Sequence, residues 1–522
     1  MEPRLKFCGW GREGEGLNDD ERSHVFRFAN EKLGAAPGVP APPPQASEIA
    51  LRRPRISAPA SLAHVLTQDP YERLLHTYGK SYPETVRAFA RDFANAPDYV
   101  GLPETEADIA AVFDWASGAK VAVIPFGAGS SVVGGVEPVV GEVYRGAVSL
   151  DMRRLNRVLE VDATSRAARI QAGILGPAIE AALKPHGFAL RHYPQSFEFS
   201  TLGGWIATRS GGHFATLYTH IDDLVESLRT VTPAGILESR RLPGSGAGPS
   251  PDRMMIGSEG SLGVITEAWM RLQGRPRFRA GAVFGFPDFF AAARAVRAAS
   301  QAGLYPSNLR VIDNHEAGTY GVNAYEESVL VLAFESADHP VDAWLARAIE
   351  LMRDNGGRRH ADEAAASRWR TAFIRMPYAR ELTAPMGIIN DTFETAITWN
   401  NFEPFHEAVR QATEDALIEA TGRKGTVSTR FTHVYPDGPA VYYTFNGLGR
   451  PGRLIEQWRH IKTRASDALI AAGGTITHHH AVGRDHMPWY RAQRPDLFGK
   501  AFAAAKNALD PAGIMNPGVL VP

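Results

Sequence analysis

The stretch Lys120–Gly135 (KVAVIPFGAGSSVVGG) constrains the fold of this chain more than any other. Its apolar run Val121–Ile124 predicts a buried strand that ends at Pro125. Four glycines follow, at positions 127, 129, 134 and 135. Because glycine accepts positive φ and allows close approach to the backbone, such a turn presents successive N–H groups to an anion. The spacing matches neither a P-loop nor G-x-G-x-x-G, so the stretch alone is equally compatible with a plain tight turn.

A helix is expected directly before this strand, which makes the stretch part of a β-α-β unit. Thr105 is the predicted N-cap, with Asp108 three residues later. Apolar residues then recur at helical spacing, and Gly118 is expected to end the helix.

Composition limits the function classes. A chain of 522 residues with 44% hydrophobic residues can form two or three domains. The net charge of −1 provides no field for nucleic acid. The single cysteine, Cys8, excludes an intramolecular disulfide and suggests a reducing compartment. Without an apolar span, a signal peptide or a C-terminal Ser-Lys-Leu, a cytoplasmic location is expected, with peripheral membrane contact left open.

Three further segments accompany the glycine turn: 194–200 (PQSFEFS), 208–211 (TRSG) and 257–263 (GSEGSLG). Together with 125–131 (PFGAGSS) they resemble the FAD-binding flavoproteins of the vanillyl-alcohol-oxidase, or PCMH, type. The resemblance implies that these segments bind FAD, with the glycine turn on the pyrophosphate. Since the turn contains no histidine, non-covalent FAD is expected. The implied cofactor-binding residues are Pro125, Phe126, Gly127, Ala128, Gly129, Ser130, Ser131, Pro194, Gln195, Ser196, Phe197, Glu198, Phe199, Ser200, Thr208, Arg209, Ser210, Gly211, Gly257, Ser258, Glu259, Gly260, Ser261, Leu262 and Gly263.

Other motifs narrow the resemblance. Trp10-Gly11, the segment 197–205 (FEFSTLGGW) and the triplet 478–480 (HHH) resemble the alkyldihydroxyacetonephosphate synthases of ether-lipid synthesis. Members of that family carry His-His-His-Gly-Val-Gly, whereas this chain has Ala481 at the fourth position. The resemblance implies exchange of an acyl group for a fatty alcohol without net redox change. It also implies small lipid substrates and a homodimer.

The same resemblance implies the site residues. Tyr442 matches the catalytic tyrosine, and the triplet His478, His479 and His480 joins it. Either Tyr442 or a neutral histidine could remove the substrate proton. Arg380, and secondly Arg310, matches the arginines that bind substrate phosphate, for which the guanidinium fork is suited.

The predicted fold class is α+β. An N-terminal arm and helical region at 1–96 precede a PCMH-type FAD-binding domain of two subdomains at 97–275. An α/β substrate (cap) domain follows at 276–455, and C-terminal helices at 456–522 return to the FAD domain and close the active site.

Alternatives remain open at this stage. An FAD-dependent D-2-hydroxyacid dehydrogenase would carry His-x-Gly-Asp-Gly-Asn-x-His as metal ligands; His433 matches the first histidine, but Tyr442 replaces the second, so no metal is expected. A flavin-free binding protein is disfavoured by the complete set of cofactor segments.

Without the resemblance, Tyr442 would be interpreted as a core residue. His192 and His213 are expected to be structural. On a strand, His479 would face away from its two neighbours, so the triplet needs a bend to line one pocket.

Overall fold

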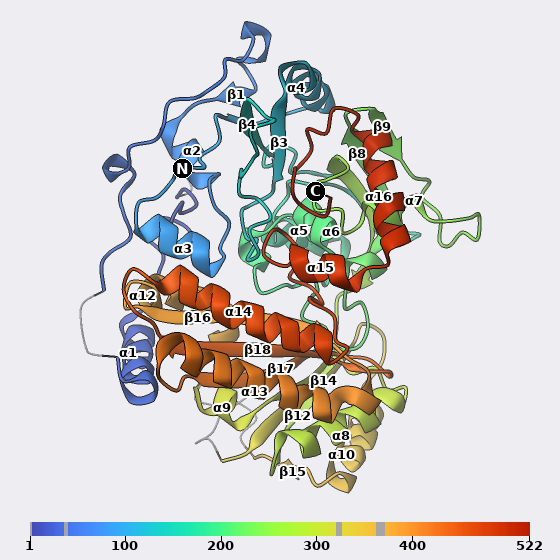
Figure 1. Cartoon of the computed structure of the whole chain (residues 1–522). Helices are drawn as coiled ribbons and strands as arrows, with labels where there is room; N and C mark the ends of the chain where they lie inside the picture. Colours follow the sequence, from blue (N-terminus) through green and yellow to red (C-terminus); the bar gives the residue numbers. More distant parts are fainter. Residues whose placement is uncertain (1–2, 36–39, 320–325, 362–370, 522) are drawn as a thin grey trace.

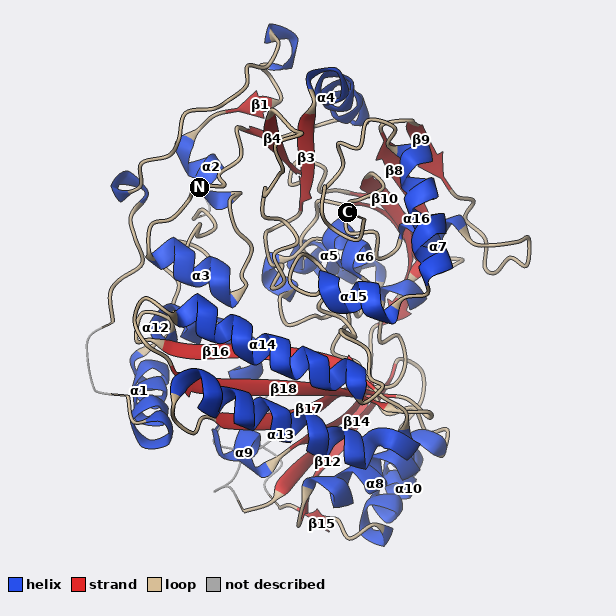
Figure 2. Cartoon of the chain, in the orientation of Figure 1, coloured by secondary structure: helices blue, strands red, loops and turns tan. Residues whose placement is uncertain are grey.

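The computed structural model describes residues 3–35, 40–319, 326–361 and 371–521. It confirms the α+β class, with an FAD-binding domain of two sheets above a cap domain built on one large sheet (Figures 1 and 2). Among the described residues, no helix is both long and apolar enough to cross a membrane.

Two sheets form the two predicted subdomains of the FAD-binding domain. The first has the order β1-β2-β4-β3, with β3 parallel to β4, and α4 packs beside it. The second is antiparallel, with the order β5-β6-β10-β8-β9. The elements of the first are β1 (Leu66–Thr67), β2 (Tyr99–Gly101), α4 (Glu106–Ala119), β3 (Val121–Phe126) and β4 (Gly146–Asp151). Those of the second are β5 (Val158–Asp162), β6 (Ala167–Gln171), α5 (Gly176–Leu183), α6 (Leu202–Thr208), β8 (Val225–Thr232), β9 (Gly235–Glu238), α7 (Pro251–Met255) and β10 (Val264–Arg271), and the short pair β7 (Phe188–Ala189) and β11 (Gln273–Gly274) lies beside them.

The predicted helix and strand around the glycine turn are present, but both end later than expected. Thr105 and Asp108 form the capping box of α4. Gly118 does not end this helix; Lys120 does, at φ 52°. Strand β3 continues through Pro125 to Phe126. Proline is tolerated there because β3 is the last strand of its sheet, so one side of its backbone needs no regular ladder partner.

The cap domain contains a seven-stranded antiparallel sheet with the order β15-β12-β14-β13-β17-β18-β16. Four helices and the sheet share one apolar core, and Figure 2 shows α13 and α14 lying across the strands. The strands are β12 (Phe278–Phe286), β13 (Asn308–Ile312), β14 (Ser328–Ser336), β15 (Arg358–Arg359), β16 (Ile388–Ala396), β17 (Thr426–Val434) and β18 (Pro439–Leu448). The core helices are α8 (Phe289–Gln301), α10 (Asp342–Asp354), α13 (Phe402–Thr421) and α14 (Leu454–Ala471); α9 (Asn314–Thr319) and α12 (Arg380–Thr383) are short.

Both ends of the chain connect the domains. The N-terminal helix α1 (Asp19–Leu33) contacts α12 and β18 of the cap, whereas α2 (Pro70–Leu75) contacts β2 and α3 (Tyr82–Phe89) contacts α14 and β16. After α15 (Met487–Gln493) and α16 (Asp496–Leu509), the C-terminal tail runs along β3, where Val123 N donates to Ile514 O at 2.8 Å. The predicted return of the C-terminal helices to the FAD domain is therefore confirmed. The exact domain boundaries stay predictions; position 455 falls within α14.

Candidate active site

A cavity of about 970 Å³ lies between the glycine turn and the cap sheet. This volume is at the upper end of the range for small-molecule sites. Residues of the glycine turn line one side, the polar face of the cap sheet lines the opposite side, and α1 contributes Val25 and Phe28.

The glycine turn meets the cavity through its backbone. Twelve of the predicted cofactor residues line the cavity: Gly127, Ala128, Gly129, Ser130, Ser131, Pro194, Gln195, Ser196, Ser200, Thr208, Ser210 and Gly211. A Cβ on Gly127 would lie 2.5 Å from Thr201 Oγ1, and one on Gly129 would lie 2.6 Å from Phe126 Cζ. Gly129 also has φ +70°, in the region that favours glycine. The turn therefore fits a group such as the pyrophosphate of FAD, bound by N–H donors without side chains in the way.

The remaining predicted cofactor residues are not among those that line the cavity: Pro125, Phe126, Phe197, Glu198, Phe199, Arg209, Gly257, Ser258, Glu259, Gly260, Ser261, Leu262 and Gly263. Several of them pack behind the lining. A Cβ on Gly260 would lie 2.7 Å from Pro125 Cγ, and one on Gly257 would lie 2.6 Å from Arg209 Cδ. Direct contact of these residues with the cofactor stays a prediction, while the packing shows that Gly257 and Gly260 lie against the segments 208–211 and 125–131, which contribute lining residues.

The opposite side of the cavity is made by alternate residues of the cap strands. On β18, Val441, Tyr443 and Phe445 belong to the apolar core, whereas Tyr442, Thr444 and Asn446 line the cavity. The alternation predicts Tyr442 rather than Tyr443 as the site tyrosine. On strand β17, Arg430 lines the cavity, whereas the next residue, Phe431, belongs to the apolar core. The alternation breaks at a register shift between Phe431 and His433, so that both Thr432 and His433 line the cavity.

Tyr442 lies within a row of charged neighbours. Arg430, its cross-strand partner, places its guanidinium 3.7 Å from the centre of the tyrosine ring. Arg430 in turn pairs with buried Glu316 at 3.0 Å, and Tyr442 Oη donates to Thr392 Oγ1 at 3.0 Å. Burial raises the pKa of Tyr442, and Arg430 only partly offsets this, so the phenol is neutral near pH 7. The sequence analysis missed Arg430, although its alternation with core Phe431 was a usable signal.

Both predicted phosphate-binding arginines line the cavity. Arg380 donates to Lys80 O at 2.7 Å and pairs with Asp391 at 2.9 Å. Arg310 is buried, and its NH1 lies 3.3 Å from His213 Nδ1. Burial, together with the nearby Arg430, lowers the pKa of Arg310 to about 9. An anion in the cavity would stabilise the charged guanidinium and so counteract the lowering of the Arg310 pKa by burial and by Arg430.

The histidine triplet lies in a loop and not on a strand. This is the bend that the triplet needed, and His479 and His480 both line the cavity. Their ring centres lie 6.2 and 5.3 Å from that of Tyr442. His478 is directed elsewhere, with its Nε2 2.8 Å from Tyr435 Oη, and is not among the lining residues.

Buried Glu394 holds the ring of His479. Its Oε2 lies 3.3 Å from His479 Nδ1, which also lies 3.0 Å from His478 Nδ1. A proton on His479 Nδ1 satisfies both contacts and leaves Nε2 as the basic nitrogen. Burial opposes ionisation of Glu394, but His479 and the adjacent histidines hold its pKa well below 4.5.

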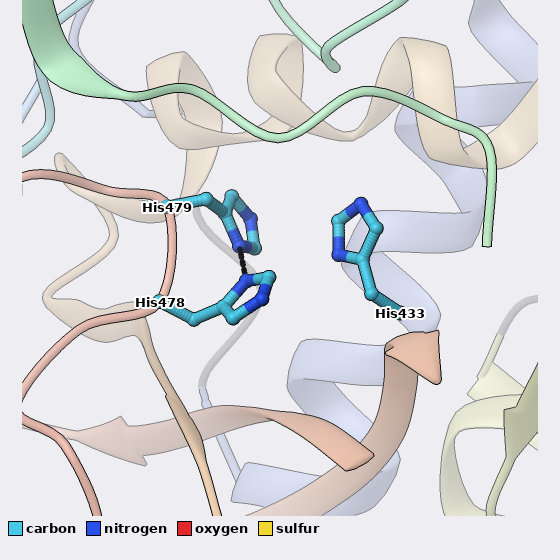
Figure 3. Close-up of side chains that lie close together, drawn as sticks. All are labelled: His433, His478 and His479. Carbon is cyan, nitrogen blue, oxygen red and sulfur yellow. Dashed lines mark hydrogen bonds between the residues drawn. The ribbon is translucent and has the colours of Figure 1, made fainter. Parts of the chain in front are cut away.

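Three imidazoles of this region, on His433, His478 and His479, have ring nitrogens within 4.8 Å of one another (Figure 3). This is close enough for them to ligate one metal ion. In the structure His433 Nε2 donates to Gly212 O at 2.9 Å, and the Nδ1 atoms of the other two face each other. The absence of a metal stays a prediction, which elemental analysis of the purified protein would test.

The two histidines that were expected to be structural, His192 and His213, differ in position. His192 is buried, its Nε2 lies 2.8 Å from Ser210 Oγ, and burial lowers its pKa to about 3, which suits the structural role expected for it. His213, expected to be structural as well, lines the cavity.

Comparison with known proteins identifies the cofactor and the relatives. Residues 97–239 match the family model of the FAD binding domain, and 275–520 match that of the C-terminal domain of FAD linked oxidases. FAD is therefore the cofactor. Alkyldihydroxyacetonephosphate synthase of Dictyostelium discoideum is 31% identical over 88% of this chain and 78% of its own length. The synthase of Trypanosoma brucei brucei is 28% identical over 99% of this chain and 92% of its own. A solved structure of alkyldihydroxyacetonephosphate synthase superposes with a TM-score of 0.81 at 27% identity, covering 98% of both chains.

Proposed function

Because this chain belongs to the alkyldihydroxyacetonephosphate synthase family, we propose that it exchanges the acyl group of acyl-dihydroxyacetone phosphate for a fatty alcohol. One observation supports this most: Tyr442, His479 and His480 meet in a cavity that is continuous with the FAD-binding glycine turn. The reaction breaks the C1–O bond to the acyl group and forms a C1–O bond to the alcohol. It releases a carboxylate and needs no external oxidant or reductant.

His479 is the general base in this proposal. Its Nε2 is the basic nitrogen, and Glu394 fixes the tautomer by accepting from Nδ1. A carboxylate behind an imidazole orients the ring and stabilises the cation that forms when the ring takes a proton. His479 is thus suited to remove the C1 proton next to the substrate ketone.

Tyr442 serves as a proton or hydrogen-bond donor, and not as a base. Its raised pKa keeps the phenol protonated. When the phenol donates its proton, the positive charge of Arg430 over the ring stabilises the negative charge that forms on the oxygen. When bound, FAD would supply the electron sink that the reaction needs.

The phosphate of the substrate is assigned to Arg310, with Arg380 as the second group. Both line the cavity, and a guanidinium binds two phosphate oxygens with its fork. Arg310 is the stronger candidate because it is buried beside Arg430, so two guanidinium charges would act on an anion there. This order is the reverse of that expected from the sequence.

The lipid chains would occupy the part of the cavity next to α1. Leu17, Val25 and Phe28 line the cavity there and offer apolar contact.

Substrates of this kind reside in bilayers, so we also propose peripheral membrane contact. Leu497 and Phe498, 76% and 52% exposed at the start of α16, are candidates for that contact. The homodimer stays a prediction, which light scattering after gel filtration would measure.

The alternative, a D-2-hydroxyacid dehydrogenase, is weaker. Tyr442 occupies the position of the second metal-binding histidine of those enzymes, and its hydroxyl donates to Thr392. The comparisons favour the synthase family as well.

The test is an exchange assay with acyl-dihydroxyacetone phosphate and a radiolabelled fatty alcohol, run beside a panel of D-2-hydroxyacids with an electron-accepting dye. We expect incorporation of the alcohol without dye reduction. Dye reduction by a hydroxyacid without incorporation of alcohol would overturn the proposal.

A further inference from the structure

The segment that carries the histidines has neither helix nor strand, yet most of its N–H groups are bound. His478 N donates to Glu394 Oε2 at 2.7 Å, and His479 N and His480 N donate to Glu394 Oε1 at 3.0 and 2.9 Å. Two residues later, Val482 N and Gly483 N donate to the two oxygens of a different carboxylate, at 2.8 Å each. That second carboxylate is Glu259.

The two carboxylates come from different domains. Glu394 is on β16 of the cap sheet, directly opposite Tyr442 on β18. Glu259 belongs to the segment GSEGSLG of the FAD-binding domain, and its backbone oxygen accepts from Asn516 Nδ2 at 2.7 Å. The histidine segment is therefore held from both sides of the domain boundary.

Between the two attachments lies a single sharp bend. Ala481 adopts φ +72°, a left-handed conformation that is unfavourable for a residue with a Cβ. The conformation persists because the bonds on both sides fix it. Five backbone N–H bonds to two buried carboxyl groups are together enough to overcome the cost of one left-handed residue.

We propose that Glu259 and Glu394 are a pair of positioning residues that hold His479 and His480 against Tyr442. This rests on the proposed function of those histidines. Glu394 acts on both the backbone and the ring of His479, whereas Glu259 acts on the backbone alone. Glu259, expected from the sequence to contact the cofactor, thereby couples the FAD-binding domain to the base of the reaction.

The first experiment compares Glu394→Gln, Glu259→Gln and a control, Glu335→Gln, as holoenzymes. Glu335 is a partly buried glutamate that pairs with Arg191 and lies on β14, with three strands between it and β16, the strand of Glu394. Glu394→Gln should lower kcat about 100-fold or more, as removal of an orienting carboxylate does elsewhere, with flavin content and KM retained. Glu259→Gln should lower kcat about 10-fold at saturating FAD, since the single amide oxygen can accept only one of the two N–H bonds. Glu335→Gln should leave kcat unchanged.

The opposite pattern would overturn the proposal. If Glu259 is a cofactor contact only, Glu259→Gln will weaken FAD binding while kcat at saturating FAD stays at the wild-type value. An unchanged kcat in Glu394→Gln would likewise remove Glu394 from this role.

A second measurement needs neither variants nor turnover. Amide hydrogen exchange on the wild-type holoenzyme should show slow exchange at His478, His479, His480, Val482 and Gly483, despite their loop conformation. Exchange as fast as in the exposed loop 244–250 would overturn the proposal. Because this readout is independent of substrate, it separates failure of this inference from failure of the proposed reaction.

Discussion

The two walls of the cavity recognise ligands by different means. The FAD-binding wall uses the backbone of 127–131, which carries no charged side chain. The cap wall uses side chains, among them Arg310, Arg430, Tyr442 and His479, contributed by strands and a loop far apart in sequence. The first wall suits a cofactor that all members of a superfamily share. We assign the reaction to the second wall, because its side chains can change while the core face of the same strands is preserved.

The largest effect is expected from Tyr442→Phe on the cap wall. Loss of a positioned proton donor should lower kcat by about 10²–10⁴-fold, with FAD still bound. Tyr443→Phe is the matched control: it removes a buried bond to His406 Nδ1 of 3.0 Å, on the opposite face of β18. It should cost about 1–3 kcal/mol of stability and leave kcat unchanged. Steady-state kinetics and thermal unfolding of both variants check this; equal kinetic losses would contradict the division of the two faces.

Arg310→Ala tests the phosphate assignment on the same wall. Loss of charge-assisted bonds worth about 1.5–3 kcal/mol should raise KM for the phosphorylated substrate roughly 10- to 150-fold. Arg279→Ala, which removes an exposed arginine on β12, is the control and should not change KM. An Arg310→Ala enzyme with wild-type KM would move the phosphate to Arg380.

Gly129→Val tests the FAD-binding wall. The side chain would meet Phe126, and the left-handed backbone would cost about 2 kcal/mol, so the free turn should relax to another conformation. Restoring the original conformation on binding should lower FAD affinity about 30-fold. Gly141→Val, at an exposed glycine where a Cβ meets nothing within 4 Å, should bind FAD normally. Titration of the apoproteins with FAD, followed by flavin fluorescence, measures both. Unchanged affinity in Gly129→Val would show that the turn is not the cradle.

Ala481→Gly should have the smallest effect. Glycine removes the left-handed penalty of about 1–2 kcal/mol but makes the unfolded chain more flexible by about 0.4–1 kcal/mol. The free energy of unfolding should therefore rise by about 0.5 kcal/mol. Ala501→Gly on α16 should instead lower it by about 1 kcal/mol. Chemical denaturation distinguishes the two signs, and a destabilised Ala481→Gly would mean that the bend is not strained.

Much of this molecule follows from local patterns. The capping box of α4 and the glycine turn after β3 were predictable because each depends on a few adjacent residues. Tyr442 followed from family resemblance, and its alternation with core residues on β18 now explains it. Arg430 was missed because an arginine that is 1% exposed needs a charge partner, and that partner, Glu316, lies 114 positions away; the local alternation with Phe431 showed only which face it lies on.

The sequence by itself determined the cofactor, because the four segments 125–131, 194–200, 208–211 and 257–263 are each local in the chain and together resemble those of FAD-binding flavoproteins. Only the tertiary structure decided how the histidine triplet is used and what Glu259 does. Both depend on hydrogen bonds across the domain boundary, between residues more than 80 and more than 220 positions apart. The four local segments together indicate FAD, and we infer that Glu394 and Glu259, through these bonds, decide which imidazoles face the cavity.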